Sequence, residues 1–379
     1  MEKILKTQRK RVLFSAEWYS PAFQLGIARY AKEAGWILDA DEHSRRLRSA
    51  RQTRHCDGLI LLPECHAPSW VKRSGIPAVS IGHRDEGLPR VGFDNHAIGR
   101  MAAAHFIERG FKDFAFYRDK FGPGENERAE GFKNAILAAG GRLHHLGALR
   151  SEAKAQRPRG KAFDSWLGRQ LLKLPKPLAI SAEFDDLAIE ALDACLAAGL
   201  RVPEQVAILG VDNDEMRCPF AAVPLSSVDS DLSGAGYAAA KLLDSLMAGG
   251  QAPHSPVLIK PKGIAVRQST DMLAIGRIEV ASALRFIWRR RDEGIRAKDV
   301  VERSGMSRQR LHQLFLEHLG RSVSAEISRR RIEAASEMLK DSKLKVHEIA
   351  KRAGFSGATH LCRSFKKECG VTPGSLRRK

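Results

Sequence analysis

The first two thirds of the chain alternates short apolar runs with longer amphipathic stretches. The apolar runs predict buried strands at Arg11–Ala16, Gly58–Leu62, Ala78–Ile81, Phe114–Tyr117, Leu178–Ser181, Val206–Val211 and Val257–Ile259. Apolar residues at helical spacing between them predict helices at Phe23–Ala34, Ile98–Glu108, Arg128–Ala139, Asp186–Ala198 and Gly236–Met247. Single strands separated by helices are typical of parallel sheets with right-handed crossovers. This pattern extends over about 260 residues, which is too long for one compact sheet, so two lobes are expected.

Near the C-terminal end, one pattern of residues occurs twice, about 50 residues apart. The two copies are Gly305-Met306-Ser307, Leu311, Phe315, Gly320 and Gly354-Phe355-Ser356, Leu361, Phe365, Gly370. The spacing differs by one residue within the unit. Such a repeat is typical of two helix-turn-helix units in tandem, and it predicts a DNA-binding module.

Each copy has the residues that a helix-turn-helix unit needs. Val300–Ser304 and Val346–Ala353 are expected as first helices, with apolar side chains at helical spacing. Gly305 and Gly354 follow where the chain must turn, since glycine adopts left-handed backbone angles without a steric penalty. The next residues in each copy are therefore expected to begin the second helix.

Ser307 and Ser356 are expected as N-caps of the second helices. The apolar side chains four apart on those helices, Leu311, Phe315, Leu361 and Phe365, are expected to face the first helices. The opposite faces are then available for DNA, and their residues are Arg308, Gln309, His312 and Gln313 in the first unit and Thr359, His360, Arg363, Lys366 and Lys367 in the second.

The net charge is concentrated in the same region. The whole chain of 379 residues has a formal net charge of +19, and the segment from Ala274 to Lys379 holds 25 basic and 12 acidic residues. A basic excess beside two recognition helices indicates phosphate neutralisation and salt-dependent binding to DNA. Any single run, such as Arg329-Arg330-Arg331, is equally consistent with a solvated helix face.

The C-terminal hundred residues resemble the AraC-type DNA-binding domain, in the segments VVERSGMSRQRLHQLF, RRRIEAASEMLKDSKLKVHEIAKRAGFS and FKKECGVTPGSLRR. The resemblance implies an all-α domain in which a long helix, roughly Ser324 to Leu339, joins two helix-turn-helix units. Both recognition helices then enter successive major grooves. Two residues depart from the family pattern, because Leu361 and Leu376 stand where aromatic residues are usual.

Residues 11 to 270 resemble the sugar-sensing core of the LacI family, which shares its two-lobed α/β fold with periplasmic binding proteins. The segments that support this are VGFDNHAIGRMAAAHFIERGFKDFAFY, ERAEGFKNAILAAGG, AGLRVPEQVAILGVDND, PLSSVDSDLSGAGYAAAKLLDSLMAGG and AVRQST. The N-terminal DNA-binding headpiece usual in LacI relatives does not precede the first expected strand. The implied fold is a periplasmic-binding-protein-like sensor, with parallel sheets flanked by helices, followed by the AraC-type domain.

The resemblance and the fold together suggest where an effector binds. In two-lobed α/β proteins the carboxyl ends of the strands border the cleft. The LacI resemblance implies that Arg128 donates to sugar hydroxyls there and that Asp212 accepts from them, with Asp185 near a further polar contact. Residues directly after the first strand are also candidates, and the full set is Glu17, Trp18, Tyr19, Arg128, Asp185 and Asp212.

Each candidate also has a purely structural interpretation. Arg128 is placed to pair with a nearby glutamate, Glu125 or Glu127, and Asp212 to cap the turn after its strand. Trp18 and Tyr19 are equally consistent with hydrophobic packing. Asp185 and its neighbour open a helix, where acidic residues favour the helix dipole with or without a ligand.

We therefore expect a sensor at 1–270, a linker at 271–276 and a DNA-binding domain at 277–379, with helix-turn-helix units at about 296–318 and 345–368. The order of sensor and AraC-type module is that of xylose-responsive regulators. It implies a homodimer that binds double-stranded promoter DNA, recruits RNA polymerase and is activated by D-xylose. The alternatives are a different sugar, a non-sugar effector, or repression. Effector binding is expected to close the lobes about hinges near Arg109–Lys112 and Ser226–Asp231.

Other classes of protein fit the sequence less well. A periplasmic solute-binding protein has an export signal and no basic helix-turn-helix pair. An enzyme of the doubly wound class is not indicated, since the chain has no GxGxxG after its first strand, no GxxxxGK[ST], no GxSxG and no HExxH. The six cysteines form no CxxC pair, so neither a metal nor another cofactor is expected. A reduced cytoplasmic protein without a membrane segment is predicted.

Overall fold

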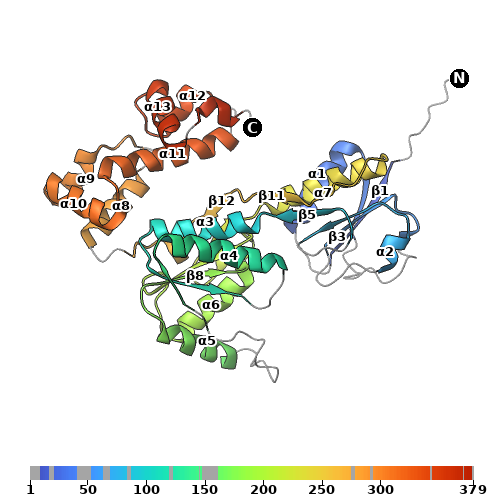
Figure 1. Ribbon diagram of the computed structural model, residues 1–379, viewed down its shortest axis with the longest axis horizontal. Helices are drawn as coiled ribbons and strands as arrows, with labels where there is room; N and C mark the ends of the chain where they lie inside the picture. Colours follow the sequence, from blue (N-terminus) through green and yellow to red (C-terminus); the bar gives the residue numbers. More distant parts are fainter. Residues whose placement is uncertain are drawn as a thin grey trace. The chain divides into compact units, whose positions relative to one another are not determined.

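The fold is described from a computed structural model, which describes residues 9–16, 21–40, 53–62, 69–82, 87–118, 123–144, 146, 161–274, 278–290, 293–341, 344–369 and 371–377. The chain divides into two compact units. The first unit comprises Met1–Ile107 and Lys112–Met272, and the second comprises Glu108–Phe111 and Leu273–Lys379. The first unit is α/β and the second is helical (Figure 1).

Lobe 1 of the first unit is built on a six-stranded parallel sheet, sheet A, in the order β11-β5-β4-β3-β1-β2. Its strands are β1 (Arg11–Ala16), β2 (Ile37–Ala40), β3 (Gly58–Leu62), β4 (Ala78–Ile81), β5 (Arg90–Phe93) and β11 (Val257–Ile259). The central strands β3 and β4 are buried at every residue. Because both faces of these strands are buried, their sequences are uninterrupted runs of mostly apolar residues.

Lobe 2 is built on a second six-stranded sheet, sheet B, in the order β12-β10-β9-β8-β6-β7. Its strands are β6 (Asp113–Tyr117), β7 (Arg142–His144), β8 (Leu178–Ala182), β9 (Val206–Val211), β10 (Ser226–Asp229) and β12 (Gly263–Ala265). All pairs are parallel except β10 with β12. Parallel pairing brings the carboxyl ends of β8 and β9 to one edge, which is where the candidate site lies.

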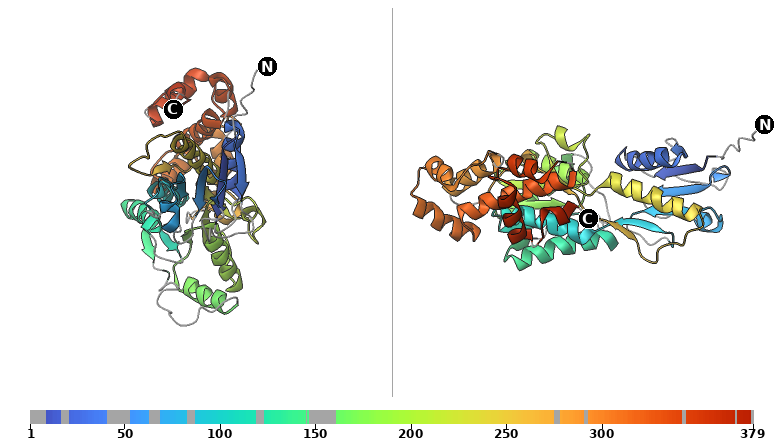
Figure 2. Two further views of the ribbon diagram at one scale, coloured as in Figure 1. Left: turned by 90° about the vertical axis from the view of Figure 1, so that its right-hand side faces the viewer. Right: turned by 90° about the horizontal axis from the view of Figure 1, so that it is seen from above.

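The helices of the first unit are α1 (Pro21–Ala34), α2 (Ser69–Arg73), α3 (Asn95–Glu108), α4 (Pro123–Ala138), α5 (Lys161–Lys173), α6 (Asp185–Ala197) and α7 (Leu232–Met247). Helix α7 follows a strand of sheet B yet packs along α1 in lobe 1, and both views show the two helices side by side (Figure 1; Figure 2, right). Glycine permits this approach, because a Cβ atom at Gly26 would lie 1.9 Å from the Ser233 carbonyl oxygen.

The chain passes between the lobes at three places, after β5, after β10 and after β11. Two of them are tied by a backbone hydrogen bond from Asp94 N to Ile259 O at 2.9 Å, and Lys262 N donates to Asp229 O at 2.9 Å. The expected hinge at Ser226–Asp231 includes the second passage. The expected hinge at Arg109–Lys112 is wrong, because this segment joins α3 to β6, and α3 packs on α4 of lobe 2.

The second unit contains the helices α8 (Ile278–Arg289), α9 (Ala297–Ser304), α10 (Arg308–Leu319), α11 (Val323–Asp341), α12 (Val346–Arg352), α13 (Ala358–Cys369) and α14 (Pro373–Arg377). Two apolar clusters hold it together. The first joins α8, α9, α10 and the start of α11, and the second joins the end of α11 to α12 and α13. The long helix α11 thus contributes to both helix-turn-helix cores.

The predicted fold class is confirmed, with two α/β lobes followed by a helical region. All seven predicted strands are present, and five of the strands described above were not predicted: β2, β5, β7, β10 and β12. Three of these lie at sheet edges, where strands are short and partly exposed. Short edge strands carry a weaker apolar pattern than central ones.

Candidate effector site and DNA-binding surface

Asp185 lies just after β8, at the first residue of α6, and its side chain is buried. Ser227 Oγ donates to its Oδ1 at 2.6 Å, and the backbone N–H of Asp214 donates to its Oδ2 at 2.8 Å. Burial, and next the charge of Asp212, raise the pKa of Asp185 to about 7. Asp185 therefore does not cap α6, because the carboxylate holds the loop after β9 instead.

Asp212 follows β9 in a turn that requires unusual backbone angles. Its φ is 103° and that of Asn213 is 53°, a region that side chains other than glycine rarely occupy. Ser230 Oγ donates to Asp212 Oδ1 at 2.7 Å. Burial raises the pKa of Asp212, and the positive charge of Arg128 opposes this rise. Backbone strain at the end of a central strand is a common feature of binding sites.

Arg128 lies on α4 and is almost completely buried. Its Nε and Nη2 donate to Asn95 Oδ1 at 3.2 and 3.0 Å, and its Nη1 donates to the carbonyl oxygen of Glu183. The guanidinium carbon also lies 5.1 Å from the centre of the Phe184 ring. Arg128 is thus a buried guanidinium that is held by an amide oxygen and a backbone carbonyl, and its charge acts on the carboxylate of Asp212.

The structure thus brings three predicted residues, Arg128, Asp185 and Asp212, to the carboxyl edge of sheet B. Together they offer a guanidinium donor and two carboxylate acceptors within a mostly apolar lobe. Such a combination of fixed donors and acceptors suits a small hydroxylated ligand. The other three candidates, Glu17, Trp18 and Tyr19, lie outside the described residues.

The sequence did not predict the residues that hold Arg128, Asp185 and Asp212 in place. Asn95 holds Arg128, and Ser227 and Ser230 hold the two aspartates. Arg267 extends the network, since its Nη2 donates to Asn213 Oδ1 at 2.8 Å. A signal was available for Asn95, because it lies two residues after a strand, where site residues are expected, but the short strand β5 was not predicted.

The first helix-turn-helix unit consists of α9 and α10. Gly305 ends α9 with a left-handed φ of 65°, and Ser307 caps α10 by accepting from Arg310 N at 3.2 Å. Leu311 and Phe315 have no exposed surface. The predictions for the turn, the cap and the inward face of this unit are therefore confirmed.

The second unit consists of α12 and α13. Gly354 has a left-handed φ of 74°, and Leu361 and Phe365 are buried as predicted. The prediction of Ser356 as the N-cap is wrong. Helix α13 begins at Ala358, Leu361 N donates to the Gly357 carbonyl, and Ser356 Oγ instead lies 3.1 Å from His360 Nδ1. The one-residue difference in spacing between the two copies accounts for this shift.

All nine residues predicted to contact DNA are exposed. They are Arg308, Gln309, His312 and Gln313 on α10 and Thr359, His360, Arg363, Lys366 and Lys367 on α13. Both helices have apolar inner faces, which their buried residues fix against the rest of the unit. The exposed faces of α10 and α13 are therefore available to a partner.

The linking helix α11 contains an ionic cluster around Glu326, whose side chain has no exposed surface. Arg321 Nε lies 2.5 Å from Glu326 Oε2, and Arg330 Nε lies 3.0 Å from Oε1. Trp288 Nε1 of α8 donates to Oε1 at 3.0 Å. Burial alone raises the pKa of Glu326, but hydrogen bonding by Arg329 and the charges of the arginines outweigh it and hold the pKa at about 2.

Two family models match the chain, one for each part. A periplasmic binding protein-like domain matches residues 103–270, and a helix-turn-helix domain matches residues 300–379. The chain is a transcriptional regulator. It joins an effector-binding sensor to an AraC-type DNA-binding domain, and it is not an enzyme.

Relatives with the same organisation match nearly the whole regulator. The xylose operon regulatory protein of Escherichia coli (strain K12) is 28% identical over 385 residues, which cover 98% of this chain and 97% of that protein. The protein of the same name from Haemophilus influenzae is 28% identical and covers 93% of each chain. The solved structure of the xylose-binding transcription activator XylR has a TM-score of 0.59 at 25% identity and covers 98% of both chains.

No described helix is long and apolar enough to cross a membrane. Among the same residues, no group of three histidine, cysteine or carboxylate side chains is arranged to hold a metal ion.

Proposed function

We propose that this regulator senses a sugar, with D-xylose as the inducer, and activates genes of sugar catabolism. The observation that carries the proposal is the buried set of Arg128, Asp185 and Asp212 at the carboxyl edge of sheet B, in a chain whose nearly full-length relatives are xylose regulators. A sugar has several hydroxyl groups, each able to donate and to accept, and this set offers both kinds of partner.

The proposed site includes Glu17, Trp18 and Tyr19 of lobe 1, which follow β1. A sugar that contacts both lobes favours the form in which they approach each other, and it shifts that equilibrium only by its difference in affinity between the two forms. The three passages between the lobes are the proposed hinges. The proposed sensor covers residues 1–270 and the linker 271–276.

The proposed DNA-binding domain covers residues 277–379, with units at about 296–318 and 345–368, and acts in the cytoplasm as a homodimer. Its exposed residues on α10 and α13 contact bases and phosphates in two major-groove segments about 10 base pairs apart. RNA polymerase is the proposed third partner, because AraC-type regulators more often activate.

The test is the thermal stability of the purified protein against a panel of aldoses, since a ligand that binds only the folded state raises its melting temperature. We expect a shift with D-xylose that Asp212→Asn abolishes. Asp186→Asn is the matched control, because Asp186 is 71% exposed and pairs with Arg217 outside the cluster. A shift with another sugar alone contradicts xylose as inducer, and no shift with any sugar contradicts the sensor proposal.

A further inference from the structure

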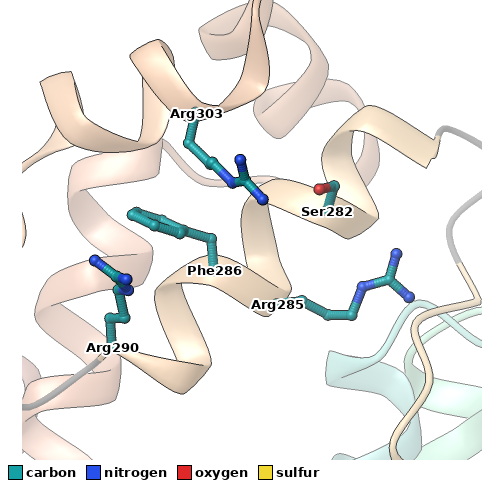
Figure 3. Close-up of a pocket in the computed structure, with 5 residues that line it drawn as sticks. All are labelled: Ser282, Arg285, Phe286, Arg290 and Arg303. Carbon is teal, nitrogen blue, oxygen red and sulfur yellow. The ribbon is translucent and has the colours of Figure 1, made fainter.

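A pocket of about 600 Å³ opens between α8 and α9 of the second unit (Figure 3). It is lined by Ser282, Arg285, Phe286, Arg290 and Arg303. All three arginines are exposed and no carboxylate lines the pocket. None of the three is among the residues already assigned to the DNA-binding surface.

These arginines differ from those around Glu326 of α11. Arg321, Arg329 and Arg330 are neutralised within the protein by Glu326 and its neighbours. In the pocket, Arg290 lies 3.5 Å from Glu293, and both side chains are more than half exposed. Within the part of the chain that the structure describes, no ion pair involves Arg285 or Arg303. The positive charges of Arg285 and Arg303 therefore have no ion-pair partner among the described residues.

The arrangement of the guanidinium groups indicates the kind of anion. Figure 3 shows them spread apart across the pocket, with Arg303 reaching down from α9 and Arg285 and Arg290 at opposite ends of the view. A single small anion is best held by donors that converge on one point, whereas a row of donors suits a chain of anions. Phe286, whose ring centre is 5.2 Å from the Arg290 guanidinium, makes one side of the pocket apolar. An apolar wall strengthens charge interactions beside it.

We propose that this pocket binds consecutive phosphate groups of the DNA backbone, as a contact separate from base reading by α10. The proposal rests on the proposed DNA-binding function. Arg303 lies in the last turn of α9, the first helix of its helix-turn-helix unit, and in such units this helix crosses the phosphate backbone. Arginine is suited to the role because its planar fork binds two phosphate oxygens at once.

The experiment compares the full-length protein with the double variant Arg285→Gln/Arg303→Gln. Fluorescence anisotropy measures the affinity for two DNA duplexes at several salt concentrations. One is an operator sequence selected in vitro with this protein, and the other is a duplex of mixed sequence. The matched control is Lys32→Gln/Lys241→Gln, which removes the same charge from exposed positions on α1 and α7. A second variant, Arg285→Lys/Arg303→Lys, keeps the charge and tests the guanidinium geometry.

Loss of two phosphate contacts reduces the slope of log affinity against log salt by about 1.8. When the salt concentration rises from about 50 to about 200 mM, the affinity of the unsubstituted protein should therefore fall about 12-fold more than that of the double variant. The loss should be equal on operator and mixed duplex, because phosphate contacts carry no sequence information. The lysine variant should keep the slope and bind more weakly.

Three outcomes overturn the inference. If the salt dependence of Arg285→Gln/Arg303→Gln has the same slope as that of the control Lys32→Gln/Lys241→Gln, the pocket makes no phosphate contact. A loss confined to the operator shows base reading instead. If the unsubstituted protein binds neither duplex, the proposed DNA-binding function itself fails. If the unsubstituted protein binds and only the expected effect of the double variant is missing, the pocket proposal alone fails.

Discussion

Glu326 and Arg329 form a buried ion pair on α11, with Arg329 Nη2 3.1 Å from Glu326 Oε1 and no exposed surface on the glutamate. Because Arg321 and Arg330 also contact this carboxylate, Glu326→Gln leaves three guanidinium groups without their shared counter-charge. We expect a loss of roughly 3–5 kcal/mol in the free energy of unfolding. Urea titration followed by circular dichroism measures it, with the exposed Glu302→Gln on α9 as control. Equal stability of the two variants contradicts the structural role.

The same carboxylate predicts a pH dependence. The folded-state pKa of Glu326 is about 2, below its ordinary value of 4.5. An acid with a lowered pKa stabilises the folded state above its ordinary pKa, and this contribution disappears as the pH falls through the folded value. We expect the unfolding free energy to decrease between pH 4.5 and about 2, by roughly 3 kcal/mol more than in Glu326→Gln. Parallel curves for both proteins contradict this assignment.

Asp185 predicts the opposite dependence in the sensor. Burial first, and then Asp212, raise its pKa to about 7 from an ordinary 3.8. The folded state therefore binds the proton more tightly than the unfolded state, and stability falls as the pH rises from 3.8 to about 7. Asp185→Asn, which keeps an acceptor for Asp214 N, should remove this fall, worth at most roughly 4 kcal/mol. The measurement is the difference in unfolding free energy between the two proteins over this range, with Asp186→Asn as control.

Gly210 provides a steric test of the effector site. A Cβ atom at this position of β9 would lie 2.1 Å from Asp185 Oδ1, so Gly210→Ala must displace the carboxylate. We expect a loss of roughly 1–3 kcal/mol in stability together with weaker sugar binding, measured by thermal shift. Gly263→Ala in β12 is the matched control, since its added Cβ meets nothing within 4 Å. If both variants bind sugar equally, Asp185 is not part of the effector site.

The sequence predicted most of the central strands and the recognition helices well, because their burial leaves a strong apolar pattern, but it missed the interior strands β5 and β10. It did worse where polar residues are buried. Ser226 and Ser227 have no exposed surface, yet their hydroxyls made β10 look like a loop. They are tolerated because each is hydrogen-bonded, Ser227 to Asp185 and Ser226 to Arg267 O. These partners are distant in sequence, so no local pattern predicts them.

Arg363 tests how the second unit reads DNA. It is exposed on α13, opposite the buried Leu361 and Phe365. If it binds guanine with both arms of its fork, Arg363→Ala should cost roughly 1–3 kcal/mol and relax discrimination at one base pair. Arg363→Lys is the informative comparison, because lysine keeps the charge but cannot form the two-point contact. Binding to operators substituted at each position separates the cases. Lysine restores a phosphate contact on every sequence, whereas a lost base contact stays lost at one position.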